Sequence, residues 1–256
     1  DDTGSPKTAV YGGATRARVS SQSWKRAVRT MFRDIFPEKD LGVRTKRIVG
    51  MVAEEIRRLG GREDAEEAAK RILENAGLKI KSVEKGTDAL FFISRAQAEE
   101  LARLATESPD TTAEKPSKEA KQKAQNALKL FPSIDIALFG RMVADDPSLN
   151  TDACSQVAHS ISTHKVTTEY DYFTAVDDLA PEDNAGAGHL GTVEFNSSTL
   201  YRYATVALHE LHEHLKGDTA EAVRGFVQAF LCSMPTGKQN TFANRTLPDA
   251  VLVTLR

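Results

Sequence analysis

The chain has 256 residues, of which 40% are hydrophobic and 27% are charged, and its net charge at pH 7 is −2. These totals are ordinary for a globular protein with one large domain or two modest ones. The only cysteines, Cys154 and Cys232, exclude a disulfide scaffold and a cysteine-rich zinc site, and they predict free, buried thiols in a reducing cytoplasm. No apolar run reaches the roughly 18–20 residues of a membrane span, and no signal peptide is recognised.

A basic strand or arm followed by an amphipathic helix is predicted near the N-terminus. Arg16 and Arg18 precede two serines, Ser20 and Ser21, which are typical helix caps. Apolar residues then recur at helical spacing as far as Pro37, which ends the helix. The apolar stripe consists of Trp24, Ala27, Val28, Met31, Phe32, Ile35 and Phe36. We assign Trp24 to the core because it lies in this stripe.

Cations form a row along the same helix. Lys25, Arg29 and Arg33 are spaced four residues apart, and Gln22 begins the row. Between Arg16 and Arg58 there are twelve Lys/Arg and five Asp/Glu, a net of +7 in a chain whose total is −2. Such segregation favours a polyanion partner or a complementary protein surface. A solvated helix face is the alternative.

Further helices and strands are expected along the chain, with Glu107–Ser117 as a linker. Their mixture predicts an α+β or α/β sheet domain that carries excursions. The expected helices are Val43–Leu59, Glu63–Asn75, Ser94 to about Ala105, a Lys/Gln/Ala helix after the linker, Ala153–Ser160 and Asp218–Cys232. The expected strands are two within Leu78–Ile93, then Ser133–Gly140, Thr163–Phe173, Leu200–Leu208 and Ala250–Leu255, and Met234–Asn240 is a loop.

Residues 174–198 are predicted to form a long excursion. From Glu169 to Glu194 there are seven acidic residues and no Lys or Arg. An acidic arm and a basic patch on one chain are complementary, so copies could stack head to tail; a solvated acidic hairpin is the alternative. Tyr172 and Phe173, at the base of the arm, belong either to the core or to a base-stacking contact.

Four other patterns are weak. The stretch His209–His214 lacks the second histidine of HExxH and suits a surface cluster better than a zinc site. Pro235–Thr241 resembles a phosphate-binding loop but lacks the first Gly of that motif. His159 and His164, with Ser160 and Ser162, suggest acid–base RNA cleavage only faintly. Asp177 and Asp178 could bind a cation, but a solvated loop is simpler.

Five segments together resemble the CasC family, the repeated backbone subunit of Cascade, the type I-E CRISPR RNA-guided surveillance complex. They are, in order, GGATRARVSSQSWKRAVR, SIDIALFGRM, STHKVTTEYDYFTAVDDL, AGAGHLGTVEF and PTGKQNTFANRTLPDAVLV. The resemblance implies an α+β fold with an RRM-like (ferredoxin-like) palm (1–42, 108–165 and 200–256), helical fingers (43–107) and an extended thumb arm (166–199). It also implies a first palm strand ahead of Asp1.

The resemblance further implies a non-catalytic, cytoplasmic scaffold that binds a guide CRISPR RNA. Copies line up head to tail, the thumb kinks the guide at intervals, and the guide pairs with target DNA. Other partners are the remaining Cascade subunits (large, small, end-capping and guide-processing) and a recruited helicase-nuclease; no cofactor is implied. The positions that match RNA-binding residues are Arg18, Ser20, Gln22, Lys25, Arg29, Met142, Tyr172, Phe173, Thr174 and Lys238.

Two other functions stay open. Backbone relatives in other CRISPR types cut RNA with an acidic residue, so an RRM-like ribonuclease that processes guide RNA or cuts target RNA would use Asp135 or Asp177. A general protein-interaction module would place the basic row against acidic protein surfaces.

Overall fold

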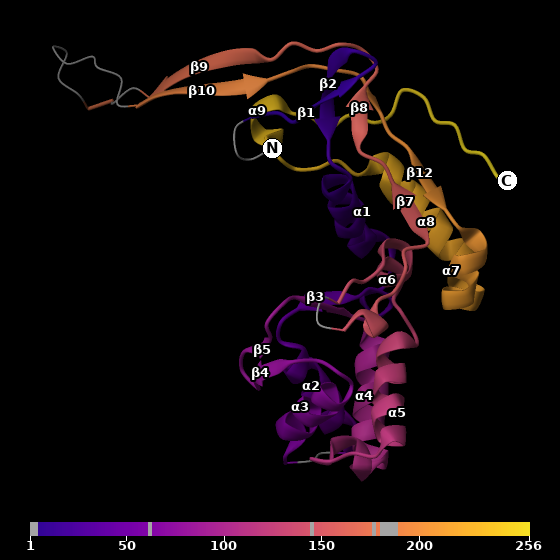
Figure 1. Cartoon of the computed structure of the whole chain (residues 1–256). Helices are drawn as coiled ribbons and strands as arrows, with labels where there is room; N and C mark the ends of the chain where they lie inside the picture. Colours follow the sequence, from indigo (N-terminus) through magenta and orange to yellow (C-terminus); the bar gives the residue numbers. More distant parts are fainter. Residues whose placement is uncertain (1–4, 61–62, 144–145, 176–177, 180–188) are drawn as a thin grey trace. The chain divides into compact units, whose positions relative to one another are not determined.

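The computed structural model describes residues 5–60, 63–143, 146–175, 178–179 and 189–256 (Figure 1). It combines helices with antiparallel strands, which confirms the predicted α+β class. The chain forms two compact units: unit 1 is Asp1–Val28, Val157–Ala204 and Phe230–Arg256, and unit 2 is Arg29–Gln156 and Thr205–Ala229. These boundaries differ from those of the predicted palm, fingers and thumb, and that three-part division stays a prediction.

An antiparallel sheet organises unit 1. Within the described residues its order is β1-β2-β8-β11. The strands are β1 (Thr8–Tyr11), β2 (Ala14–Val19), β8 (Ser160–Ser162) and β11 (Leu200–Tyr201). Gly12 and Gly13, both with positive φ, make the turn between β1 and β2, as expected for a two-residue hairpin loop.

The two faces of this sheet differ in exposure. Ala17, Ser160 and Ser162 are buried on one face. On the other, Arg18 lies opposite Ile161, and Ile161 lies opposite Tyr201. Because directly opposed residues of an antiparallel ladder share a face, these side chains belong to the side of the sheet that we call the open face.

Helix α1 (Ser21–Ile35) follows β2 directly, as predicted. Trp24, Val28, Phe32 and Phe36 are buried, so the apolar stripe is confirmed. The indole Nε1 of Trp24 donates a hydrogen bond of 2.8 Å to Ser160 Oγ. Trp24 is therefore a core residue attached to the buried face of the sheet.

The acidic excursion begins and ends as a two-stranded hairpin. Strands β9 (Glu169–Ala175) and β10 (His189–Phe195) pair antiparallel over their full length (Figure 1). Every residue of β9 is exposed. At its base, the rings of Phe195 and Phe242 lie 5.7 Å apart, so the short helix α9 (Gln239–Phe242) packs beside β10.

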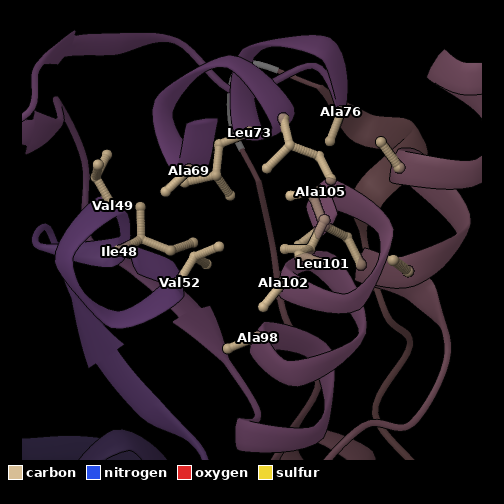
Figure 2. Packing of buried hydrophobic residues seen from close by; sticks show 14 of the residues in the cluster. Ile48, Val49, Val52, Ala69, Leu73, Ala76, Ala98, Leu101, Ala102 and Ala105 are labelled. Carbon is tan, nitrogen blue, oxygen red and sulfur yellow. The ribbon is translucent and has the colours of Figure 1, made fainter. Parts of the chain in front are cut away.

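Unit 2 is built around a helical core. Figure 2 shows apolar side chains of α2, α3 and α4 meeting between the helices, among them Val52, Leu73 and Leu101. The helices are α2 (Ile48–Gly60), α3 (Ala65–Asn75), α4 (Arg95–Glu107) and α5 (Lys118–Lys129). Ser94 and Gln97 form a capping box at the start of α4, which confirms the predicted cap.

Short elements complete the chain. The strands are β3 (Val43–Thr45) paired with β6 (Phe91–Ile93), β4 (Ile80–Ser82) with β5 (Gly86–Thr87), and β7 (Ser155–Val157) with β12 (Ala204–Val206). The helices are α6 (Ile134–Phe139), α7 (Leu208–Leu215) and α8 (Thr219–Cys232). Single 3-10 turns cover Glu38–Asp40, Pro109–Thr112, Pro147–Leu149 and Lys216–Asp218.

Several predicted elements were wrong in type. Ser133–Gly140, expected as a strand, contains α6, because a short run buried throughout carries no period that separates helix from strand. Ala153–Ser160, expected as a helix, contains β7 and the start of β8. The stretch Val43–Leu59 begins as β3 rather than as a helix, and Ala250–Leu255 forms no strand.

Other predictions were only partly right. Glu107–Ser117 is no bare linker, because Thr111 is fully buried and its carbonyl accepts a hydrogen bond of 2.9 Å from Asn75. The strand predicted over Leu200–Leu208 is broken into β11 and β12. Of the two thiols expected to be buried, only Cys154 is; Cys232 is exposed. Burial raises the pKa of Cys154 to about 11.

A buried carboxylate joins three segments of unit 2. Asp135 is 1% exposed and accepts hydrogen bonds from Arg29 Nε at 2.7 Å, from the Gly42 amide at 2.8 Å and from Ser133 Oγ at 2.7 Å. Arg29 also donates to the Gly42 carbonyl and lies 4.4 Å above the Phe92 ring. The carboxylate thus fixes the start of α6 against α1 and the loop before β3.

We predict that Asp135→Asn destabilises the protein. The amide cannot compensate the Arg29 charge or accept all three bonds, and an unpaired charge in a largely buried site costs about 2–4 kcal/mol. Urea unfolding measures the loss. The matched control is Glu66→Gln, whose ion pair with Arg57 is half exposed on both sides and should change stability by less than about 1 kcal/mol. Equal losses of stability for the two substitutions would contradict the structural role assigned to Asp135.

Candidate nucleic-acid interface

The predicted RNA-binding residues divide between the two units. Unit 2 carries Arg29 and Met142. Unit 1 carries the others, which are Arg18, Ser20, Gln22, Lys25, Tyr172, Phe173, Thr174 and Lys238. Their contact with RNA stays a prediction, and the structure describes the surroundings in which each side chain lies.

The start of α1 presents polar groups next to β2. Gln22 is exposed and Lys25 is half-buried, while Ser20 is buried with its Oγ 3.0 Å from Ser23 Oγ. The first turn of α1 contains no acidic residue. A helix of this length offers unpaired amides and the positive end of its dipole there, so this end of α1 favours an anion such as a phosphate.

Two of the predicted arginines are held by protein groups. Arg18 Nε donates to the Thr8 carbonyl at 3.0 Å, which holds the guanidinium beside β1. Arg29 is ion-paired with Asp135. A contact between Arg29 and RNA would have to coexist with this ion pair. For Lys25, one turn earlier on α1, no ion pair within the described residues competes with a phosphate.

The hairpin places the predicted thumb residues on both of its sides. Tyr172 lies opposite Thr192, and Phe173 lies opposite Gly191. Successive residues of a strand point to opposite faces, so the two rings face in opposite directions. A Cβ on Gly191 would come within 2.2 Å of the Phe173 ring, which shows that this ring lies directly over the glycine.

Met142 and Lys238 are positioned by their neighbours. Met142 is 84% exposed and directly follows Arg141, whose guanidinium is buried and donates to the carbonyls of Phe92, Leu128 and Leu149. Burial lowers the pKa of Arg141 to about 10. Lys238 has a φ of 59° at the start of α9, and α9 packs at the base of β10. The Lys238 loop is thereby brought beside the hairpin.

A stack of one cation on two aromatic rings was not anticipated from the sequence. The Arg202 guanidinium lies 3.7 Å from the centre of the Trp24 ring and 4.3 Å from that of Phe230. Its Nε and Nη2 are buried without a hydrogen-bond acceptor among the described residues. Burial lowers the pKa of Arg202 to about 10. The faces of the two rings therefore provide the electrostatic compensation for this charge.

The weaker sequence patterns gain no support as sites. Ser160 Oγ accepts from Trp24, and Ser162 Oγ donates to the His164 carbonyl, so both hydroxyls are engaged on the buried face. In the described part of the chain, no group of three or more His, Cys, Asp or Glu is arranged to hold a metal ion. Asp177 lies outside the described residues. None of the helices described here is long and apolar enough to cross a membrane.

Comparisons with known proteins define the family. The model of the CT1975-like protein family matches residues 1–256, and the chain belongs to this family. No curated protein matches the sequence. A solved chain of a "CRISPR RNA-guided surveillance complex, pre-nicking" is 39% identical with a TM-score of 0.76, over 97% of this chain and 72% of that one. Another, of a "CRISPR RNA-guided surveillance complex", is 30% identical with a TM-score of 0.59, over 93% and 68%.

The contribution of the Arg202 stack to stability can be measured, because Trp24 is the single tryptophan of the chain and its fluorescence reports on the stack. Arg202→Ala should lower the free energy of unfolding by about 2–4 kcal/mol, because both ring contacts and the packing of the arginine stem are lost. The emission of Trp24 should shift to longer wavelength as water reaches the ring. Arg202→Met keeps the bulk of the side chain and removes a buried charge, so it should lower the free energy of unfolding by less than about 1.5 kcal/mol.

The control is Arg224→Ala on α8, whose side chain is 74% exposed. It should leave both stability and Trp24 emission close to those of the unaltered protein. If Arg202→Ala behaves like this control, the stack does not contribute to folding.

Proposed function

We propose that this protein is a guide-RNA-binding backbone subunit of a CRISPR surveillance complex. The observation that carries the proposal is its likeness to a subunit of such a complex, at 39% identity over 97% of this chain. The polar N-terminal end of α1 and the exposed aromatic hairpin supply the two kinds of contact that hold single-stranded nucleic acid, namely phosphate binding and base stacking.

In the finer form of the proposal, the protein is the type I-E backbone subunit, CasC. Several copies polymerise head to tail along one guide RNA, and the thumb arm, which includes β9 and β10, kinks the guide at intervals. The bases between kinks then pair with target DNA. The partners are other copies of the chain, the remaining Cascade subunits and a recruited helicase-nuclease.

Contacts to phosphates suit this role because they carry no sequence information. A subunit that must accept any guide gains affinity from the backbone and leaves the base edges free for pairing. Gln22 and Lys25 on α1 are suited to such contacts, and Tyr172 on the exposed hairpin is suited to stack on an unpaired base. The complementary charges of the acidic hairpin and the basic N-terminal region favour an ordered approach of neighbouring copies.

The protein is proposed to be non-catalytic. Of the two acidic residues considered for a ribonuclease, Asp135 is buried and saturated by Arg29, Gly42 and Ser133, which weighs against a role in cutting RNA. Incubation with labelled guide and target RNA, with and without Mg²⁺, tests this point. Intact RNA is the expected result, and site-specific products would favour the ribonuclease. Failure to retain RNA during purification would instead favour a general protein-interaction module.

We predict that Lys25→Ala weakens RNA binding by about the same factor for unrelated guide sequences. Loss of one phosphate contact should reduce the slope of log affinity against log salt by about one. Fluorescence anisotropy over a salt series measures both quantities.

The matched control is Lys70→Ala, because Lys70 is also a half-buried lysine on a helix and belongs to no predicted site. This substitution should leave affinity and slope unchanged. Losses for Lys25→Ala that depend on the guide sequence would contradict a phosphate contact.

A further inference from the structure

The open face of the unit 1 sheet has a hollow, and none of the residues that line it is among the predicted RNA-binding residues. Its volume is about 610 Å³. Three of its lining side chains are tyrosines, each more than half exposed: Tyr11 on β1, Tyr201 on β11 and Tyr203 just after β11. Arg16 and His159 also line it. All of these residues belong to unit 1.

Arg16 is fixed in position at the wall of this hollow. Its Nε donates to the Tyr11 carbonyl at 3.1 Å, and its Nη1 donates to the Ser162 carbonyl at 2.9 Å. The guanidinium also lies 5.8 Å from the centre of the Tyr11 ring. A cation held in this way loses little side-chain entropy when it meets a ligand.

Tyr201 and Tyr203 are positioned by the residue between them. Arg202 points away from the hollow into the stack with Trp24 and Phe230. The Tyr203 carbonyl accepts a hydrogen bond of 3.0 Å from Ala158, and Tyr201 pairs with Ile161 of β8. Because side chains alternate along an extended segment, anchoring Arg202 inward directs both phenol rings outward.

The charge of the hollow favours an anionic ligand. The residues that line it include no Asp or Glu, although the chain as a whole is slightly acidic. Arg18 adds a second arginine to the same face, next to Ile161. Flat aromatic rings beside a fixed cation fit a nucleotide, in which a base offers a π-face and the phosphate a negative charge.

We propose that this open face is a second nucleic-acid site, in which one unpaired nucleotide stacks on Tyr201 or Tyr203 while its phosphate meets Arg16. The inference rests on the proposed function in taking the ligand to be nucleic acid, and it adds a contact apart from α1 and the hairpin. The strand bound there is single-stranded RNA or DNA, which share this chemistry.

The test uses the full chain and oligonucleotides that contain 2-aminopurine, a base whose fluorescence falls when it stacks. One oligonucleotide is RNA and the other is DNA of the same sequence. Tyr201→Leu and Tyr203→Leu should each weaken binding by about 5- to 150-fold, the equivalent of one stacked base, and should restore part of the fluorescence. The stronger of the two binders identifies the strand.

Conservative variants separate stacking from folding. Tyr201→Phe and Tyr203→Phe keep the rings, so their affinity should stay within about twofold of that of the unaltered protein. This change is smaller than the loss of one stacked base would cause. Arg16→Gln should reduce the salt slope by about one. Unchanged Trp24 emission in all variants shows that the fold is kept, because that ring lies beneath the opposite side of the sheet.

The outcomes distinguish this site from the proposed function. If the unaltered protein binds RNA and the leucine variants bind it equally well, the second site is wrong and the proposed function stands. If the leucine variants lose self-association instead of affinity, the open face joins copies of the chain and holds no nucleotide. If the unaltered protein binds neither oligonucleotide, both proposals fail.

Discussion

The indole of Trp24 connects two of the parts of unit 1 that bear candidate sites, the start of α1 and the four-stranded sheet. Its ring is 1% exposed, its Nε1 is bonded to Ser160 on β8, and its face is covered by Arg202, which also covers Phe230. One aromatic side chain of α1 therefore contacts the sheet and the segment after β11. The polar end of α1 and the tyrosines of the open face depend on this contact for their positions.

The stack also shows how a buried guanidinium can be tolerated without an ion pair to any residue that the structure describes. The buried nitrogens of Arg202 lack acceptors among the described residues, and burial alone would disfavour the charge. The faces of Trp24 and Phe230, both within 4.3 Å of the guanidinium, offset that cost. The buried guanidinium of Arg141 in unit 2 is stabilised differently: it donates to backbone carbonyls and lies over the ring of Phe91.

The sequence predicted those features that depend on local periodicity and capping. The apolar stripe of α1, the helix cap at Ser94 and the acidic excursion were all evident from spacing and composition. Ser133–Gly140 was misassigned because burial on every side removes the period. The inward roles of Arg29, Arg141 and Arg202 could not be predicted, since each depends on partners far away in the sequence.

The excess of +7 between Arg16 and Arg58 consequently overstates the charge that is free to meet a polyanion. Arg29 is paired with Asp135, Arg57 with Glu66, and Arg58 with Glu99, and these three carboxylates lie outside that range. Arg44 lies over Phe92, and burial, followed by the charge of Arg29, lowers its pKa. A nucleic-acid interface on this chain accordingly depends on a few well-placed groups, on helix amides and on aromatic rings more than on total charge.

The most direct test of this account is the mass and nucleic-acid content of the protein after co-expression with a guide RNA. Light scattering combined with absorbance at 260 and 280 nm gives both values on one sample. We expect a ribonucleoprotein in which several protomers share one RNA. A monomer free of nucleic acid, obtained with the guide and the other complex subunits present, would contradict the account.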